Sequence, residues 1–376
     1  MKKLQMVDLQ TQYKFIKDQV DSSVIEIFKR GTFINGPSVK EFQKQLEDYL
    51  NVKHVIPCAN GTDALQIALM SLDLKPGDEI ITSDFTFAAT VEVIALLKLK
   101  PVLVDIDEDT FNINCDEISK SITSKTKAII PVHLFGQVAN MEKVMEIAEL
   151  NNLYVIEDNA QAIGAVYNTG QKTGTIGHLG TTSFFPSKNL GCYGDGGAIF
   201  TNDDNLAHSI RGIVNHGMYV RYHHDVVGVN SRLDSVQAAV LKAKLPLLDF
   251  YNERRKEASI LYSNNFSDNK NLIIPIVKES CQSHVFHQYT LRVLNGKRDD
   301  LSNFLNENDI PHGIYYPIPL HMQKAYLDER YKKQDFKISL MMSREVISLP
   351  MHSELEHDQI NFISEKINQF FKDLDN

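Results

Sequence analysis

Short apolar runs alternate with amphipathic stretches from about residue 54 onward. The apolar runs predict strands at His54–Pro57, Glu79–Thr82, Pro101–Asp105, Lys127–Val132 and Tyr154–Glu157. The amphipathic stretches predict helices at Thr62–Leu72, Thr86–Leu97, Met141–Asn151 and Asn205–Val214. Strands that alternate with helices favour an α/β fold, with a mostly parallel central sheet covered by helices on both faces.

The pattern differs on either side of this region. Residues 8–30 and 38–50 read as two helices that precede the first strand. Towards the C-terminus, Pro246 interrupts or bends a helical stretch, and helices and strand-like runs of mixed order follow it. A helix is predicted before Pro246, over Ser231–Leu245, and a charged helix over Asn252–Tyr262 and a strand over His287–Val293 are predicted after it. We therefore expect a large domain over residues 1–245 and a smaller α+β domain over residues 246–376.

Composition narrows the class of protein. The chain has 376 residues, of which 43% are hydrophobic and 23% charged, as in soluble globular proteins. A net charge of −9 without a basic cluster makes nucleic acid and anionic membranes unexpected partners. The N-terminus lacks the apolar core of a signal peptide, and no transmembrane stretch is present, so we expect a cytoplasmic protein. The four cysteines have no metal-ligand spacing, which predicts reduced thiols and no metal site.

A lysine lies in a turn between two apolar stretches, Thr181–Phe185 and Gly197–Thr201. A lone lysine in a loop is usually solvated. Here the apolar flank would desolvate Lys188, lower the pKa of its amine and make that amine nucleophilic. Such an amine forms an imine with an aldehyde, as enzymes that use pyridoxal phosphate (PLP) require.

An acid follows an apolar strand upstream of this lysine, in Leu153-Tyr-Val-Ile-Glu-Asp158-Asn-Ala-Gln161. By itself Asp158 could be a helix cap or a surface acid. Together with Lys188 it is a candidate partner for the protonated pyridine nitrogen of PLP, which makes the ring an electron sink. Gln161 could donate a hydrogen bond to the phenolic oxygen of the ring. A strand-borne Asp followed by a loop-borne Lys is the order found in fold-type I PLP enzymes.

Three further residues are candidates for the phosphate and one for the ring. Gly61 and Thr62 link a predicted strand to a predicted helix, whose free N–H groups suit a phosphate. Simple capping of that helix by Asn60 is the alternative. Ser183 supplies a second hydroxyl, and Phe87 could stack on a planar ring or belong to the core.

Two other segments carry polar and aromatic side chains. Asn230 and Arg232, in Asn230-Ser-Arg-Leu-Asp234, could cap and salt-bridge a helix or reach an anionic ligand. Tyr315, Tyr316 and His321 lie in a proline-rich loop that suits either sugar or nucleotide contact or packing between domains.

Together these motifs resemble the DegT-type nucleotide-sugar aminotransferases of fold-type I, from about residue 5 to the C-terminus. The similarity rests on Ala59-Asn-Gly-Thr-Asp-Ala-Leu65, Pro131-Val-His-Leu-Phe-Gly136, Val155-Ile-Glu-Asp158-Asn-Ala-Gln161, Ser183–Lys188 and Asn230-Ser-Arg-Leu-Asp234.

The resemblance implies a PLP-dependent aminotransferase that is an obligate homodimer with shared active sites. Lys188 would bond to the cofactor, and Asp158 would pair with its ring nitrogen. Phe87 would stack on the ring, and Gln161 would lie near its oxygen. The phosphate would be bound by Gly61, Thr62 and Ser183, together with Asn230 of the partner subunit. The residues that would face the sugar or its nucleotide are Arg232, Tyr315, Tyr316 and His321.

The glycine-rich turn Gly191-Cys-Tyr-Gly-Asp-Gly-Gly197 is similar to that of enzymes that aminate 3-keto sugars. The resemblance is strongest to UDP-2-acetamido-2-deoxy-3-oxo-glucuronate aminotransferases, which use glutamate and serve O-antigen synthesis for lipopolysaccharide. That group commonly has His-Tyr-Pro where this chain has Tyr315-Tyr316-Pro317. UDP-3-keto-GlcNAc and a dTDP-3-keto-6-deoxyhexose are therefore alternative substrates. A PLP-dependent sugar dehydratase would carry His in place of Lys188, and a non-catalytic PLP-binding regulator would need a further module.

Overall fold

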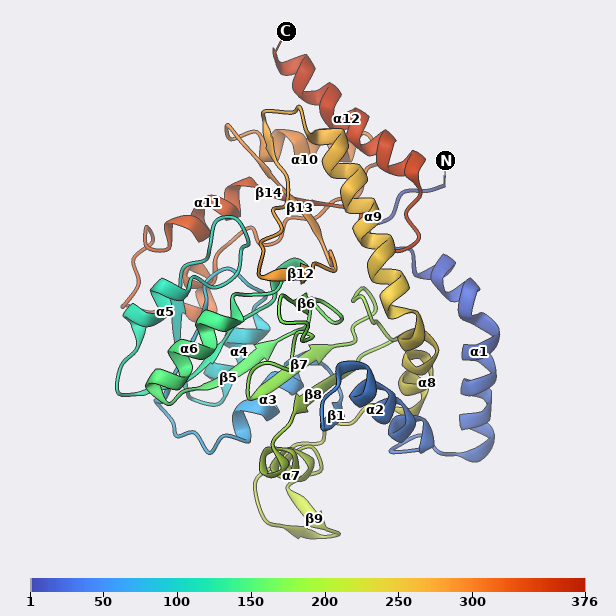
Figure 1. The fold of residues 1–376 in the computed structure, drawn as a ribbon, viewed down its shortest axis with the longest axis vertical. Coiled ribbons are helices and arrows are strands. Elements are labelled where there is room, and N and C mark those ends of the chain that lie inside the picture. The colour runs from blue at the N-terminus through green and yellow to red at the C-terminus, as the bar shows by residue number, and fades with distance from the viewer. Residues whose placement is uncertain (1, 376) are drawn as a thin grey trace.

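The computed structural model describes residues 2–375, and within them seven strands form a central sheet in the order β1-β8-β7-β5-β4-β2-β3 (Figure 1). All neighbouring strands are parallel except where β8 pairs with β1 and β7. The strands are β1 (His54–Cys58), β2 (Glu79–Ser83), β3 (Lys100–Val104), β4 (Thr126–Ile130), β5 (Tyr154–Asp158), β7 (Leu179–Ser183) and β8 (Gly197–Thr201). The predicted fold class, a mostly parallel sheet in an α/β protein, is confirmed.

Helices cover both faces of this sheet, because successive residues of a strand point to opposite faces. Ile80 and Ile156 belong to the core beneath one set of helices, α3 (Gly61–Met70), α4 (Ala89–Leu96) and α7 (Asp204–Ile213). Ile81 and Val155 belong to the core on the other face, beneath α5 (Cys115–Ser121) and α6 (Met141–Asn151). At the β1–β8 end, α2 (Pro37–Leu50) and α8 (Ser235–Lys244) close the core, and α1 (Leu9–Arg30) packs against α8.

The C-terminal part forms a second core. Strands β11 (Leu272–Ile273), β13 (Tyr289–Val293) and β14 (Val346–Leu349) pair antiparallel, and α9 (Leu248–Phe266), α10 (Arg298–Glu307) and α12 (His357–Asp375) pack against them. Figure 1 shows α9 as a long helix that leads from α8 to this second core. The shorter elements are β6 (Val166–Tyr167), β9 (Met218–Val220), β10 (His223–His224), β12 (Cys281–Ser283), α11 (Lys337–Glu345), and the 3-10 turns η1 (Leu134–Gly136), η2 (Leu245–Leu247), η3 (Leu320–Met322) and η4 (Lys324–Tyr326).

Pro246 interrupts the helix as expected, since α8 ends at Lys244 and α9 begins at Leu248 after the turn η2. Contacts join the two parts: among others, β12 pairs with β6, and Leu4 packs against the C-terminal core. The division at residues 245 and 246 stays a prediction.

Three simpler observations bear on the protein class. In residues 2–375, no helix has the length and apolar character that spanning a bilayer requires. The four cysteines are free thiols and are buried. Across the same described residues, no group of three His, Cys, Asp or Glu side chains could hold a metal ion.

Candidate active site

A cavity of about 660 Å³ lies where several strands of the central sheet end. The carboxyl ends of parallel strands meet at one edge of a sheet, so residues distant in sequence gather there. The predicted site residues that line the cavity are Gly61, Thr62, Phe87, Asp158, Gln161, Ser183, Lys188, Tyr315 and Tyr316.

Lys188 lies in the turn between β7 and β8, which are neighbours in the sheet. Its backbone N–H donates a 2.8 Å hydrogen bond to the carbonyl of Phe185, which closes the turn. Burial lowers the pKa of the Lys188 amine to about 8, although the charge of Asp158 opposes this shift. At pH 7 about one tenth of the amine is therefore uncharged and nucleophilic, far more than for an ordinary lysine.

Asp158 is the last residue of β5, and its carboxyl group is held by two donors. Its Oδ2 accepts from the hydroxyl of Thr90 at 2.9 Å, and its Oδ1 accepts from the backbone N–H of Ala160 at 3.2 Å. Burial raises the pKa of this carboxyl group, while these hydrogen bonds and the charge of Lys188 oppose the shift. A bound cation is what such a fixed, buried acid needs to stay ionised.

The turn before α3 gives the cavity an anion-binding end. Asn60 caps the helix, because its Oδ1 accepts from the N–H of Asp63 at 2.8 Å, as the capping alternative predicts. A Cβ atom at Gly61 would lie 2.7 Å from Cβ of Ser183, so only glycine allows this approach. The N-terminus of α3 and the hydroxyls of Thr62 and Ser183 consequently line one end of the cavity.

Two phenylalanines in one short segment have opposite surroundings. Phe85 is fully buried, whereas Phe87 is 59% exposed and lines the cavity. The ring centroids of Phe87 and Tyr316 are 6.4 Å apart. An aromatic face left open towards a cavity suits a planar ring, so the stacking alternative for Phe87 fits better than the core alternative.

Gln161 joins two parts of the cavity wall. Its Oε1 accepts from the N–H of Phe135 at 2.8 Å, and its Nε2 donates to the hydroxyl of Tyr316 at 3.1 Å. The loop that carries Tyr315 and Tyr316 is thereby held against the residues that follow β5.

Three predicted site residues do not line this cavity. Asn230 is exposed and Arg232 is half-buried. Between them, the hydroxyl of Ser231 accepts from the N–H of Ala59 at 3.0 Å and donates to Oδ2 of Asp63 at 2.6 Å, which fixes the segment beside the α3 turn.

His321 is the third of these residues. It is buried, and its Nδ1 lies 2.7 Å from Oδ2 of Asp84, whose other oxygen accepts from the backbone N–H of His321 at 2.7 Å. The structure therefore separates His321 from Tyr315 and Tyr316, which the sequence had grouped with it. The physical reason is the buried carboxylate of Asp84, which engages the imidazole and its backbone together.

The cavity also contains residues that the sequence analysis did not single out: Thr86, Asp195, His287 and Gln288. The hydroxyl of Thr86 is buried and has no hydrogen-bond partner among the described residues. In the sequence, the feature that could have marked Thr86 as a site residue is its place as a polar residue between two phenylalanines. For His287 the signal was a pair of histidines, His284 and His287, at the start of a predicted strand.

These features test whether PLP fits the site. An unpartnered buried hydroxyl at Thr86 and an open aromatic face at Phe87 both call for a ligand. The amine, the acid and the anion-binding helix end match the aldehyde, ring nitrogen and phosphate of PLP in chemical type. The residues present therefore fit this cofactor.

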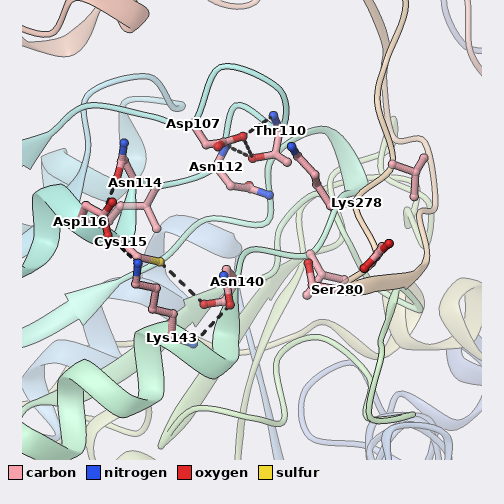
Figure 2. A pocket seen from close by; sticks show the side chains of 14 residues that line it. Asp107, Thr110, Asn112, Asn114, Cys115, Asp116, Asn140, Lys143, Lys278 and Ser280 are labelled. Carbon is pink, nitrogen blue, oxygen red and sulfur yellow. Dashed lines mark hydrogen bonds and ion pairs between the residues drawn. The ribbon is translucent and has the colours of Figure 1, made fainter.

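A second cavity of about 660 Å³ lies between residues 107–116, the start of α6 and residues 277–280 (Figure 2). It contains none of the predicted site residues. Its two lysines form ion pairs, Lys143 with Asp116 and Lys278 with Asp109. Asp107 accepts from the N–H and the hydroxyl of Thr110 at 2.9 and 3.0 Å, so these polar groups satisfy one another.

Comparison with known proteins places this geometry in context. Residues 14–368 match the profile of the DegT/DnrJ/EryC1/StrS aminotransferase family. A "Pleiotropic regulatory protein" of Geobacillus stearothermophilus is 45% identical over 368 residues, 98% of each chain. A UDP-2-acetamido-2-deoxy-3-oxo-D-glucuronate aminotransferase of Pseudomonas aeruginosa is 43% identical, over 96% of this chain and 98% of its own. A UDP-N-acetyl-3-dehydro-alpha-D-glucosamine 3-aminotransferase of Acidithiobacillus ferrooxidans is 41% identical over 94% of each.

Solved structures agree. A DegT DnrJ EryC1 StrS aminotransferase from Brucella abortus superposes with a TM-score of 0.92 and 40% identity, over 98% of this chain and 99% of that chain. A structure from Bacillus subtilis with bound cofactor PMP has a TM-score of 0.89 and 31% identity, over 95% of this chain and 82% of that chain.

Proposed function

Because the chain belongs to the DegT/DnrJ/EryC1/StrS aminotransferase family, we propose that it moves the amino group of glutamate to the 3-keto group of a nucleotide-linked sugar. The enzyme is a PLP-dependent sugar aminotransferase. The sugar that we propose is UDP-2-acetamido-2-deoxy-3-oxo-glucuronate, and the setting is cytoplasmic synthesis of a surface polysaccharide such as O-antigen. The observation that carries the proposal is the single cavity that holds Lys188, Asp158 and the α3 turn.

When bound, PLP supplies an aldehyde that accepts an amino group and a ring that withdraws electrons. Asp158 would keep the ring nitrogen protonated, since its carboxyl group is fixed by Thr90 and Ala160. Phe87 would cover the ring, and Gln161 would lie near the ring oxygen. Gly61, Thr62 and Ser183 would hold the phosphate at the α3 terminus.

Lys188 has two tasks in this scheme. Its uncharged amine binds the cofactor, because burial favours the neutral form. When it is free, the Lys188 Nζ would be a base of suitable strength to move a proton between two carbon atoms. Phe87, Tyr315 and Tyr316 line the cavity, and their aromatic side chains would limit the access of water to the reacting atoms once the cofactor is bound.

The partner subunit would complete each site. Asn230 is exposed in one chain and lies outside its cavity. Large apolar side chains are also exposed nearby, with Tyr222 at 75% and Val227 at 86%. An exposed apolar patch beside a polar segment suits a protein interface. We therefore propose that Asn230 of the partner subunit lies at the phosphate, and that Arg232 faces the sugar or its nucleotide.

The identity of the sugar depends on Arg232 and the tyrosine loop. A guanidinium is a planar fork that suits a carboxylate, and Tyr315 and Tyr316 can donate to sugar hydroxyls while they pack on the ring. Relatives that act on the uronate and on the 3-keto-glucosamine are similarly identical to this chain, at 43% and 41%. UDP-3-keto-GlcNAc and a dTDP-3-keto-6-deoxyhexose are the alternatives.

The test is a panel of nucleotide-linked 3-keto sugars, each assayed with glutamate for the aminated product. We expect the highest kcat/KM with the UDP-linked uronate. Arg232→Lys should reduce turnover of the uronate more than that of the matching 6-hydroxyl sugar, since lysine lacks the fork. Arg344→Lys, at an exposed position of α11, is the control. Turnover of dTDP-linked 6-deoxy sugars alone would reject the uronate and leave the aminotransferase intact.

A regulator that binds PLP without catalysis is less consistent with the chain. The relative from G. stearothermophilus carries a regulatory name. This chain nevertheless has both Lys188 and Asp158 in the cavity, and the charge of Asp158 acts on the pKa of the Lys188 amine. The same lysine disfavours a sugar dehydratase, in which histidine occupies that position.

A further inference from the structure

Two segments that are remote in the chain lie side by side at the cavity wall: residues 84–87, which follow β2, and residues 315–321, which lead into η3. Both supply side chains that line the cavity. The ring centroid of Tyr316 lies 5.8 Å from that of Phe85 and 6.4 Å from that of Phe87. The relative position of the two segments therefore decides how much space remains beside Phe87.

Asp84 joins the same two segments at their other end. Its backbone carbonyl accepts from the N–H of Leu320 at 3.0 Å. Its Oδ1 accepts from the backbone N–H of His321 at 2.7 Å, and its Oδ2 lies 2.7 Å from Nδ1 of the same residue. The exposed fractions of the two side chains are 0% for Asp84 and 1% for His321. We call these contacts between buried groups the Asp84–His321 clamp.

Both ring nitrogens of His321 face oxygen atoms that accept hydrogen bonds. Nδ1 faces the carboxylate of Asp84, and Nε2 lies 3.4 Å from the carbonyl oxygen of Lys333. A neutral imidazole has a proton on one nitrogen only, so the other nitrogen would direct a lone pair at an oxygen atom. An imidazolium donates from both nitrogens. The geometry therefore favours the charged form of His321.

The charges around the imidazole favour the same form. The charged and titratable groups that act on the pair come from three elements: Asp84 from the residue after β2, Asp105 from the residue after β3, and Tyr331 and Asp335 from the segment before α11. Burial by itself lowers the pKa of His321, but the hydrogen bond and the charge of Asp84, together with the charge of Asp335, raise that pKa above its ordinary value. The clamp should therefore stay protonated at neutral pH and lose a proton only as the pH rises through the raised pKa.

We propose that His321 is a positioning residue for the cofactor ring: its imidazolium, held between Asp84 and the carbonyl of Lys333, fixes the loop of Tyr316 opposite Phe87 and so defines the space that the ring enters. The proposal rests on the proposed function, in which Phe87 covers the ring of PLP. His321 does not line the cavity, so it acts through Asp84 and the loop. Loss of one proton would leave a lone pair against an oxygen atom and weaken the clamp, so cofactor binding should weaken at alkaline pH.

The test compares the wild type with His321→Asn. The asparagine amide can donate to Asp84 from a place close to that of Nδ1, but it does not titrate between pH 6 and 10. The probe is pyridoxamine phosphate (PMP), the amine form of the cofactor, which binds without a bond to Lys188. Its dissociation constant is measured by fluorescence titration of each cofactor-free protein across this pH range. Lys188 and PMP titrate in both proteins, so the ratio of the two dissociation constants isolates the effect of His321.

We expect the PMP dissociation constant of the wild type, divided by that of His321→Asn, to rise roughly tenfold from pH 7 to pH 10, because a charge-assisted hydrogen bond is lost in the wild type alone. A constant ratio would overturn the proposal, since a purely structural role would change binding equally at every pH. His312→Asn is the matched control, because His312 bonds instead to the hydroxyl of Ser302 and the carbonyl of Ile310, at 2.7 and 3.1 Å. The wild type should keep its alkaline loss of affinity in that variant.

A measurement on the unaltered, cofactor-free protein covers the case in which the variant does not fold. With ¹⁵N-labelled histidine, we expect both ring nitrogens of His321 to carry protons at pH 7, and the ring to titrate above the ordinary histidine pKa of about 6.5. An unprotonated ring nitrogen at pH 7 would overturn the proposal. Failure of the wild type to bind PMP at any pH would instead overturn the proposed function, and the histidine signals would still decide the state of the clamp.

Discussion

Asp158 and Lys188 line one cavity, and burial drives the acid and the amine towards their neutral forms. The charge of Lys188 lowers the pKa of Asp158 and the charge of Asp158 raises the pKa of Lys188, so each charge opposes the pKa shift that burial causes in the other group. They meet because β5 pairs with β7 in parallel, with Asp158 opposite Thr181, and the lysine turn follows β7. A bound pyridinium would replace the amine as the cationic partner of Asp158, so cofactor binding should leave the acid ionised.

Replacement of the lysine should separate binding from catalysis. In Lys188→Ala the cofactor can still bind through the α3 turn, but no amine bonds to it or moves the proton. We expect turnover to fall by at least about 10²–10⁴-fold, the usual contribution of an acid–base group. The measurement combines kcat with the visible absorbance of the wild-type imine, which glutamate should bleach. Turnover close to wild type would contradict the assignment.

The rate of cofactor capture should depend on pH. Only the uncharged amine of Lys188 attacks an aldehyde, and its pKa is lowered to about 8. The rate constant for PLP binding to the cofactor-free protein should therefore rise as the pH increases through 8 and level off above it. Stopped-flow absorbance between pH 6 and 10 measures this. A midpoint near the ordinary lysine value would show that the amine is not desolvated.

The charge of Asp158 should matter more than the hydrogen bond that fixes it. Asp158→Asn removes the charge that holds the pyridinium, and we expect a loss of about 3 kcal/mol in transition-state stabilisation, roughly 10²-fold in kcat. Thr90→Val removes only the 2.9 Å hydrogen bond to Oδ2, so its effect should be about 1 kcal/mol. The kcat values of both variants are compared in one assay. Equal losses of kcat in Asp158→Asn and Thr90→Val would mean that the charge of Asp158 adds nothing beyond its hydrogen bond to Thr90.

Shared active sites should allow two inactive chains to complement each other. Asn230→Ala should impair phosphate binding in the partner's site, and Lys188→Ala should inactivate its own. A mixed dimer then contains one site that is wild type at both positions, so activity should return when subunits exchange. Sedimentation and activity are followed after mixing. An active monomer, or no recovery in a proven mixed dimer, would contradict the shared site.

A second buried lysine should make stability depend on pH. Nζ of Lys244 donates to the carbonyl of Gly191 at 2.7 Å, and burial lowers its pKa to about 7. The unfolded chain, with a lysine pKa of about 10.4, binds more protons between these values, so the free energy of unfolding should increase with pH there. Relative to Lys244→Met, we expect a slope of up to roughly 1.4 kcal/mol per pH unit in denaturant unfolding. The exposed control Lys40→Met should keep the wild-type slope.

The sequence determined the order of strands and helices, because the period of apolar positions reflects local backbone geometry. The predicted strand His54–Pro57 is β1, and the predicted helix Met141–Asn151 is α6. It also indicated the chemistry of the site, since an acid that ends a buried strand and a lysine in an apolar turn are together what a PLP enzyme requires. The family resemblance rests on those same residues.

Only the tertiary structure decided which side chains reach the cavity. The helix expected from Thr86 begins at Ala89, so Thr86 and Phe87 stay in the loop that faces the cavity. Local pattern could not tell Phe87 from Phe85, which lies in the core. It could not show that Asp84 holds His321 across 237 residues of chain, or that His287, from another part of the fold, lines the same cavity as Lys188. Such contacts join residues far apart in sequence, and they depend on how whole elements pack, which the periodicity of any one segment does not encode.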